Sequence, residues 1–213
     1  PKKPNIAIIG GSKVSTKINI FHNLINFCDV IAIGGAMANT FLKSKKINIG
    51  KSFYEENFIA TASDIMERSV QKNCKIILPV DGVCADNLNS QTNIRECDIN
   101  NVYNNQMILD VGSKTINLMS QHILKSKMIL WNGPLGAFEY NSFAKASIKI
   151  ANIIKRHTKL KKISSIAGGG DTISVIKNAN AEDGFTYISN AGGAFLEWLE
   201  GQESPGIIAL KEN

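Results

Sequence analysis

The sequence predicts an α/β fold: a three-layer, Rossmann-like domain with a largely parallel central sheet and helices on both faces. Short apolar runs rich in Ile and Val alternate with longer amphipathic stretches, and most of the short runs end in glycine. This alternation is typical of a parallel sheet covered by helices. The chain has 213 residues, of which 44% are hydrophobic and 20% charged, so it can bury a core. No internal repeat or linker-like tract divides it, and we expect one domain over residues 1–213.

The apolar runs set the expected strands and the amphipathic stretches the expected helices. Strands are expected at residues 6–9, 30–33, 75–78, 107–109, 128–131, 163–167 and 186–189. Helices are expected at residues 14–26, 37–44, 55–72, 113–125, 142–156, 172–177 and 191–200. Residues 81–105 are polar and rich in asparagine, which indicates short extended segments joined by turns.

Charge and hydropathy limit the possible partners. The net charge of +6 and the pI near 9.1 favour anionic ligands, which include nucleic acid, lipid and phosphorylated small molecules. The densest basic run, residues 155–162, closes a helical pattern and has no interleaved aromatic residues for base stacking, so no nucleic-acid partner is expected. The apolar runs are far shorter than the roughly 20 residues of a membrane helix. We see no signal-peptide pattern and expect a cytoplasmic monomer.

The cysteines and histidines do not indicate a metal or redox site. Cys28, Cys74, Cys84 and Cys97 form no CxxC pair, and the three histidines are isolated from them and from one another. We expect buried or incidental thiols and ordinary surface histidines.

Glycines recur where the expected strands end. They are Gly10-Gly11, Gly34-Gly35, Gly112, Gly133 with Gly136, Gly168-Gly169-Gly170 and Gly192-Gly193. In an open α/β sheet, the carboxyl ends of the strands and the helix starts that follow them form the ligand-binding edge, where glycine lets backbone N–H groups approach an anion. A single glycine pair indicates only a tight turn, but the recurrence at one edge predicts an anion site.

The first motif is GGSKVSTK, residues 10–17. A helix beginning near Val14 would place Lys13 and Lys17 one turn apart, where their mutual repulsion favours an anionic ligand. Gly11 and Ser12 would contribute backbone and hydroxyl donors. The spacing matches neither the phosphate-loop motif nor GxGxxG, so the residues indicate phosphate binding without either signature.

The second motif is Gly168-Gly169-Gly170-Asp171-Thr172, between an expected strand and a helix. The glycines expose N–H groups to a phosphate, and Thr172 can donate to the same group. Asp171 can hold Mg²⁺, which binds through one or two carboxylates together with phosphate oxygens. The alternative is that Asp171 only caps the helix.

Two further motifs follow strands. In WNGPLGAFE, residues 131–139, Asn132 and Glu139 flank a rigid turn and suit a sugar and its adjoining phosphate, although a structural loop would have the same pattern. In SNAGGA, residues 189–194, Gly192 and Gly193 could stabilise the charge of a phosphoryl group in transfer. Two other segments are not expected to bind ligand: Asp29 begins a strand instead of ending one, and residues 112–115 indicate a capped helix start.

Taken in order, these segments resemble the C-terminal, nucleotide-binding domain of the phosphoglycerate kinase family. The motifs that carry the resemblance are GGSKVSTK at 10–17, IGGAMANTFLK at 33–43, LPVD at 78–81, LDVG at 109–112, WNGPLGAFE at 131–139, GGGDT at 168–172 and AGGAFLEWLEG at 191–201. The resemblance covers nearly the whole chain. Asn190 departs from the threonine that is usual in the family before the last glycine pair.

The resemblance implies reversible transfer of the acyl phosphate of 1,3-bisphosphoglycerate to MgADP, giving ATP and 3-phosphoglycerate. Lys13 would meet the transferred phosphoryl group, Lys17 the nucleotide phosphates, Asp171 the Mg²⁺ ion, and Gly192 and Gly193 the transition state. The implied nucleotide contacts are Gly168, Gly169, Gly170, Thr172 and Asn132 on phosphates, Pro134 and Glu139 on the ribose, and Gly34, Gly35, Met107 and Leu109 around the adenine.

The same resemblance places the 3-phosphoglycerate site on an N-terminal domain that would precede Pro1 and is absent from this chain. The chain alone is therefore expected to bind nucleotide and to turn over poorly. Two alternatives are a nucleotide-binding module without catalysis and a dinucleotide-dependent oxidoreductase.

Overall fold

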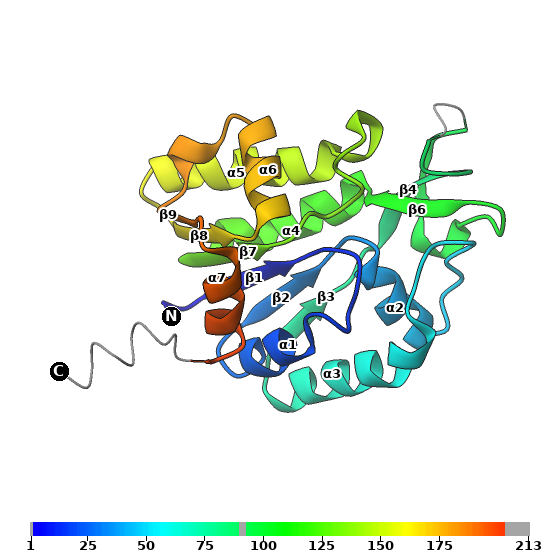
Figure 1. The fold of residues 1–213 in the computed structure, drawn as a ribbon, viewed down its shortest axis with the longest axis horizontal. Helices are drawn as coiled ribbons and strands as arrows, with labels where there is room; N and C mark the ends of the chain where they lie inside the picture. Colours follow the sequence, from blue (N-terminus) through cyan, green and yellow to red (C-terminus); the bar gives the residue numbers. More distant parts are fainter. Residues whose placement is uncertain (1, 90–92, 203–213) are drawn as a thin grey trace.

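A six-stranded parallel sheet with helices on both faces forms the centre of the molecule (Figure 1). The structure is a computed structural model and describes residues 2–89 and 93–202. The strand order is β3-β2-β1-β7-β8-β9. The strands are β1 (Asn5–Ile9), β2 (Val30–Ile33), β3 (Lys75–Ile77), β7 (Met128–Asn132), β8 (Ser164–Gly168) and β9 (Tyr187–Ser189). The predicted fold class is confirmed.

Strand β1 shows why the sheet is covered on both sides. Ile6 and Ile8 belong to one buried cluster, whereas Ala7 and Ile9 belong to another, because successive side chains of a strand point to opposite faces. The first cluster packs under α4 (Ser113–Lys125), α5 (Lys145–Lys159) and α6 (Gly170–Asn178). The second packs under α1 (Ile18–Leu24), α2 (Met37–Ser44), α3 (Ile59–Gln71) and α7 (Gly192–Leu199). The alternation therefore divides the helices into two layers.

A second, smaller sheet was not predicted. It is antiparallel, has the order β5-β4-β6, and consists of β4 (Asp81–Ala85), β5 (Arg95–Asp98) and β6 (Met107–Val111). The strand expected at residues 107–109 thus lies outside the central sheet. Residues 86–94 join β4 to β5 and are fewer than the dozen or so residues of a parallel crossover, so these two neighbouring strands pair in antiparallel fashion.

The first helix begins later than predicted. It starts at Ile18 instead of near Val14, and Lys17 is its N-cap. Residues 14–17 form a turn because the Ser15 backbone N–H and hydroxyl both donate to the Glu55 carboxylate, at 3.0 and 2.5 Å. Lys13 and Lys17 therefore do not lie one turn apart on a helix, and the argument from their repulsion is wrong.

Short 3₁₀ turns precede two of the other helices. Glu56–Phe58 leads into α3, and Asn141–Phe143 leads into α5, where single helices were expected from residues 55 and 142. Within the described ranges, no helix is both long enough and apolar enough to span a bilayer.

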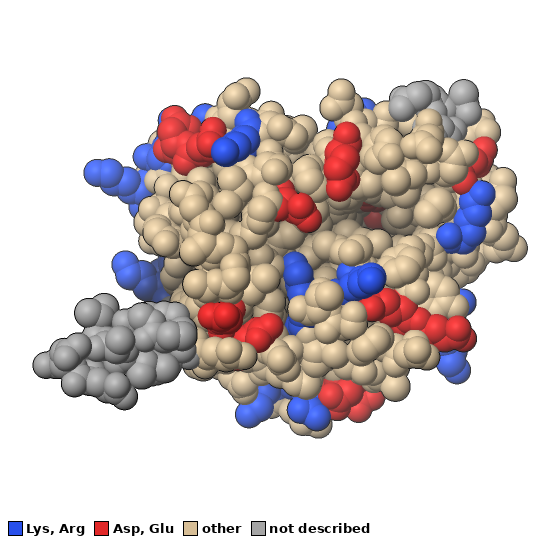
Figure 2. All heavy atoms as spheres, in the orientation of Figure 1, with Lys and Arg blue, Asp and Glu red and all other residues tan. Residues whose placement is uncertain are grey.

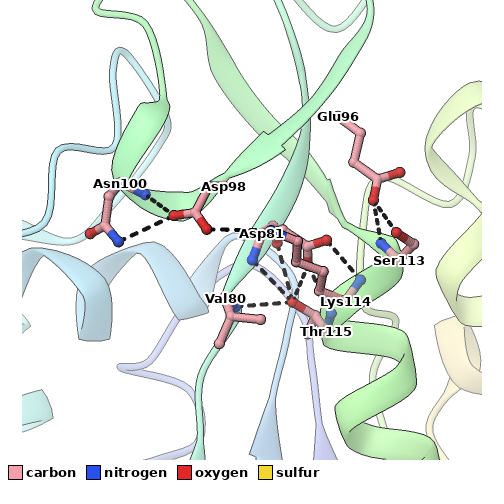
Figure 3. A network of polar contacts seen from close by, with 8 residues as sticks. All are labelled: Val80, Asp81, Glu96, Asp98, Asn100, Ser113, Lys114 and Thr115. Carbon is pink, nitrogen blue, oxygen red and sulfur yellow. Dashed lines mark hydrogen bonds and ion pairs between the residues drawn. The ribbon is translucent and has the colours of Figure 1, made fainter.

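Helix α4 is capped from another strand. The Asp81 carboxylate, from β4, accepts the N–H groups of Lys114 and Thr115, both at 2.8 Å, and the Thr115 hydroxyl (Figure 3). Glu96, from β5, accepts the N–H and hydroxyl of Ser113, and these bonds lower the pKa of its carboxyl group. The capped helix start expected at residues 112–115 is present. Its caps are carboxylates from other strands, whose negative charges are stabilised by the positive end of the helix dipole.

Loss of the buried cap should destabilise the fold. Asp81 is almost fully buried, and in an Asp81→Asn variant one oxygen that accepts N–H and O–H donors becomes an NH₂ group. We expect the free energy of unfolding to fall by about 1–3 kcal/mol, because buried donors lose their acceptor. Urea denaturation measures the change. Glu96→Gln alters an exposed cap on the same helix and should cost less; equal losses in the two variants would contradict this account.

Candidate functional site

The loops that follow β1, β2 and β7 are held together by backbone hydrogen bonds at the carboxyl edge of the sheet. The N–H groups of Gly10 and Gly11 donate to the carbonyl oxygens of Asn132 and Pro134, at 2.9 and 3.1 Å, and the Gly35 N–H donates to the Leu135 carbonyl at 2.8 Å. The strand ends that were expected to share an edge therefore meet there.

The glycines at this edge have two different roles. A Cβ atom on Gly10 would lie 1.9 Å from the Pro134 carbonyl oxygen, and one on Gly35 would lie 2.4 Å from the Gly11 carbonyl oxygen. These two glycines are required because backbone segments pass too close for any side chain. By contrast, a Cβ atom on Gly170, Gly192 or Gly193 would meet no heavy atom within 4 Å. These three positions are open where a side chain would lie, so close packing does not explain their glycines.

A half-buried lysine and a buried asparagine connect three strand ends. The Lys17 ammonium donates to the Gly10 carbonyl and to the Asn132 side-chain oxygen, both at 2.6 Å. The Asn132 amide in turn donates to the Gly168 carbonyl at 2.8 Å. Burial lowers the pKa of Lys17 from 10.5 to about 8, and the nearby charge of Asp171 partly opposes this shift. Lys17 is thus a cation held by neutral oxygens, with one carboxylate close enough to interact with its charge.

A cavity of about 350 Å³ opens beside this network. Figure 2 shows a hollow on this face of the molecule, bordered by acidic and basic side chains. The cavity wall includes eight of the predicted site residues: Gly11, Ser12, Gly35, Met107, Leu109, Pro134, Glu139 and Asp171. Its volume lies within the range of small-molecule sites, and the mixture of apolar walls with a few carboxylates is typical of them.

The other predicted residues lie outside this wall. Asn132 and Thr172 are almost fully buried, and Thr172 accepts the Gly133 N–H at 2.7 Å. Lys13 is exposed on the loop between β1 and α1. The remaining predicted residues that do not line the cavity are Lys17, Gly34, Gly168, Gly169, Gly170, Gly192 and Gly193. Asp171 lies in the first turn of α6, where Gly169 is the N-cap, so the alternative in which Asp171 itself caps the helix is wrong.

The sequence analysis missed Asp110, which lines the cavity and is 2% exposed. Burial raises the pKa of its carboxyl group to about 7, although two backbone N–H donors and Lys145 favour the ionised form. The available signal was a lone acid inside the apolar run of β6. Phe53 and Phe138 also line the cavity and were not predicted.

A larger hollow of about 730 Å³ lies between α1 and α7, against the central sheet. Its lining includes Phe27, Tyr187 and Trp198, all well exposed, but no charged side chain and none of the predicted site residues. Size alone would favour this hollow; the chemistry of the residues favours the smaller cavity at the carboxyl edge.

Comparison with known proteins identifies the family. The family model described as phosphoglycerate kinase matches residues 1–202. The chain belongs to the phosphoglycerate kinase family. It is 44% identical over 212 residues to a phosphoglycerate kinase of Chelativorans sp. strain BNC1, and 45% identical over 211 residues to one of Mesorhizobium japonicum. These alignments cover 100% and 99% of this chain but 53% of each relative.

Solved structures of phosphoglycerate kinases share the fold. The structure of the Coxiella burnetii enzyme matches the whole chain with a TM-score of 0.94 at 39% sequence identity. The structure of the Pyrococcus horikoshii enzyme matches 99% of the chain with a TM-score of 0.81 at 26% sequence identity. The chain spans about half of each, 54% and 52% respectively. The chain thus spans about half the length of the phosphoglycerate kinases that it matches.

The half-buried ammonium of Lys17 should make stability depend on pH. Its folded-state pKa of about 8 lies below the ordinary 10.5, so between these values the unfolded chain binds more protons. The contribution of Lys17 to stability therefore rises with pH across this window. We expect the free energy of unfolding of the unmodified chain, relative to Lys17→Met, to increase between pH 7.5 and 10 in urea denaturation. Parallel pH profiles would show that Lys17 titrates normally.

Proposed function

We propose that this chain is the C-terminal, nucleotide-binding half of a phosphoglycerate kinase. In this proposal it binds MgADP and MgATP and, together with a second half, transfers the acyl phosphate of 1,3-bisphosphoglycerate to MgADP. The observation that carries the proposal is the cavity at the carboxyl edge, whose wall includes both apolar residues and Asp171 at the start of α6. Phosphates favour such helix starts. As a member of a glycolytic enzyme family, the protein is proposed to act as a cytoplasmic monomer.

The apolar part of the cavity suits the base and the ribose. Met107 and Leu109 on β6 would pack against the adenine together with Gly35, and the adjacent Gly34 would act from behind the cavity wall, where it packs against Leu135. Pro134 and Glu139 lie in the loop after β7, and the exposed Glu139 carboxylate can accept ribose hydroxyl groups.

The polar part suits the phosphates. N–H groups at the junction of β8 and α6, from Gly168 to Thr172, would bind phosphate oxygens together with Ser12. The Gly11 N–H already donates to the Pro134 carbonyl, so Gly11 would contribute through the shape of its loop. Asn132, whose side chain holds Lys17 and Gly168, would act mainly by orienting these groups. Among the residues that the structure describes, the hydrogen-bond acceptors of the Lys17 ammonium are neutral oxygens. A bound phosphate would therefore give this ammonium an anionic partner.

Asp171 fits a magnesium ion that is shared with the nucleotide. The described residues contain no cluster of three or more acidic, histidine or cysteine side chains that could form a protein-only metal site. A single exposed carboxylate at the rim of a phosphate site is the donor set that Mg²⁺ accepts, since this ion keeps several waters and binds phosphate oxygens directly. When bound, the ion would neutralise phosphate charge.

Phosphoryl transfer depends on positioning and electrostatic stabilisation more than on covalent chemistry by the protein. Lys13 is exposed, so its ammonium can reach a phosphoryl group outside the cavity. Gly192 and Gly193 begin α7, where the first N–H groups have no acceptor within the helix, and a Cβ atom on either residue would meet no heavy atom within 4 Å. We propose that these residues stabilise the group in transfer.

Nucleotide binding can be measured directly by calorimetry. MgADP or MgATP should bind, and NAD should not, because the site offers a phosphate edge without the dinucleotide signature. Asp171→Ala should weaken MgADP binding by about 1–3 kcal/mol, through loss of a charge-assisted contact, and Lys17→Ala should do the same if it remains folded. Lys177→Ala, near the C-terminal end of α6, serves as the control. Unchanged affinity in both site variants, or a preference for NAD, would overturn the assignment.

The isolated chain should bind nucleotide without appreciable turnover. The 3-phosphoglycerate site is proposed to lie on the N-terminal half that this chain lacks, so the acyl phosphate has no place to bind. A coupled assay of ATP formation from 1,3-bisphosphoglycerate and MgADP measures this. Rapid ATP formation by this chain alone would contradict the proposal.

A further inference from the structure

Asp110 connects the wall of the cavity to the start of a helix. It lies on β6, directly after Leu109, and its carboxylate accepts the Val111 N–H at 2.9 Å and the Ala146 N–H at 3.0 Å. Ala146 belongs to the first turn of α5, and the N-cap residue, Ala144, has no side-chain acceptor. Asp110 therefore supplies the negative cap that the sequence of α5 lacks.

The loop after β7 packs against the same carboxylate. A Cβ atom on Gly136 would lie 2.3 Å from an Asp110 carboxylate oxygen, so the loop backbone passes in direct contact with it. On either side, the Ala137 N–H donates to the Leu109 carbonyl at 2.8 Å, and the Leu135 N–H donates to the Ser147 hydroxyl at 2.9 Å. The loop is thus fixed to β6 and α5, which Asp110 joins.

Every residue of this loop from 134 to 139 lines the cavity, Pro134 and Glu139 among them, while β6 contributes Met107 and Leu109. A change in the contact at Asp110 would move these two walls relative to each other. Asp81 makes a similar cap on α4, but it does not line the cavity. Both buried carboxylates thus cap a helix, but only Asp110 of the two also lines the cavity.

We propose that Asp110 is a positioning residue for nucleotide binding, whose ionised carboxylate holds β6, α5 and the loop of residues 134–139 in the arrangement that accepts the nucleotide. The inference rests on the proposed function. Both hydrogen-bond partners of the carboxylate are N–H donors, so ionised Asp110 can satisfy both, whereas the neutral acid loses one acceptor position to its own proton.

The surroundings of Asp110 make this contact sensitive to pH near neutrality. Burial raises the pKa of its carboxyl group to about 7, and Lys145 at the start of α5 opposes that shift. The other titratable groups on the elements around it include Glu139 on the loop, Asp171 on the cavity wall, Lys149 on α5, and Asp81 and Cys84 on β4, which pairs with β6. Lys17, whose pKa is about 8, stays protonated below neutrality.

The test compares MgADP affinities of the unmodified chain and Asp110→Asn from pH 5.5 to 8.5. At pH 8 the variant should bind about three- to tenfold more weakly, as loss of a charged helix cap predicts. At pH 5.5, where Asp110 is protonated in the unmodified chain, the two affinities should converge to within about twofold. The ratio of the two MgADP affinities at each pH removes the titrations that both proteins share, including those of Lys17 and of the nucleotide phosphates.

Asp81→Asn is the matched control, and its affinity ratio should stay near one throughout. A purely structural role for Asp110 would give a ratio that does not change with pH, and this result, or a ratio near one at every pH, would overturn the inference. If the unmodified chain bound no MgADP at any pH, the proposed function itself would fail, and with it this inference.

A measurement on the unmodified chain keeps the inference testable if the variant does not fold. Carboxyl ¹³C NMR should show the Asp110 titration near pH 7, and saturating MgADP should move its midpoint down by about half to one pH unit. Reciprocity requires this, because a ligand that binds the ionised form more tightly must favour ionisation by the same factor. An unchanged or raised midpoint would overturn the inference.

Discussion

The carboxyl edge of the sheet depends on one half-buried cation. The Lys17 ammonium hydrogen-bonds to the end of β1 at Gly10 and, through Asn132 at the end of β7, is linked to the end of β8 at Gly168. Burial of a charge is costly, as the lowered pKa of about 8 indicates, and neutral oxygens compensate only in part. The same interaction that joins three strands therefore leaves a positive charge for which an anionic ligand is a favourable partner.

Much of this arrangement could be predicted because local patterns determine it. The short apolar run of β1, buried on both faces of the sheet, and the alternation of strands with helices are visible in the sequence, and the parallel sheet follows from them. Glycines after β1, β2, β7 and β8 indicated a shared edge. The backbone contacts at Gly10 and Gly35 show that part of this signal reflects close packing of loops, while Gly170 has the open surroundings expected of a ligand site.

The features that were missed depend on side chains far away in the sequence. Glu55 holds the turn that delays the start of α1, and Asp81 and Asp110 cap α4 and α5 from neighbouring strands. The helices themselves carry no side-chain caps that would mark these starts. Asp110 was missed for a related reason. The sequence around an acid in an apolar strand does not indicate its role, because the helix that Asp110 caps and the loop that it contacts lie more than 20 residues further along the chain.

The central claim is that the nucleotide binds at this edge, with its phosphates beside Lys17 and the start of α6. A crystal structure of the chain with MgADP tests it most directly. The account predicts the base between β6 and Gly35, the phosphates within hydrogen-bonding distance of the N–H groups at Gly168–Thr172, and the metal on Asp171. Nucleotide bound instead in the apolar hollow between α1 and α7, with Asp171 contacting neither metal nor phosphate, would contradict it.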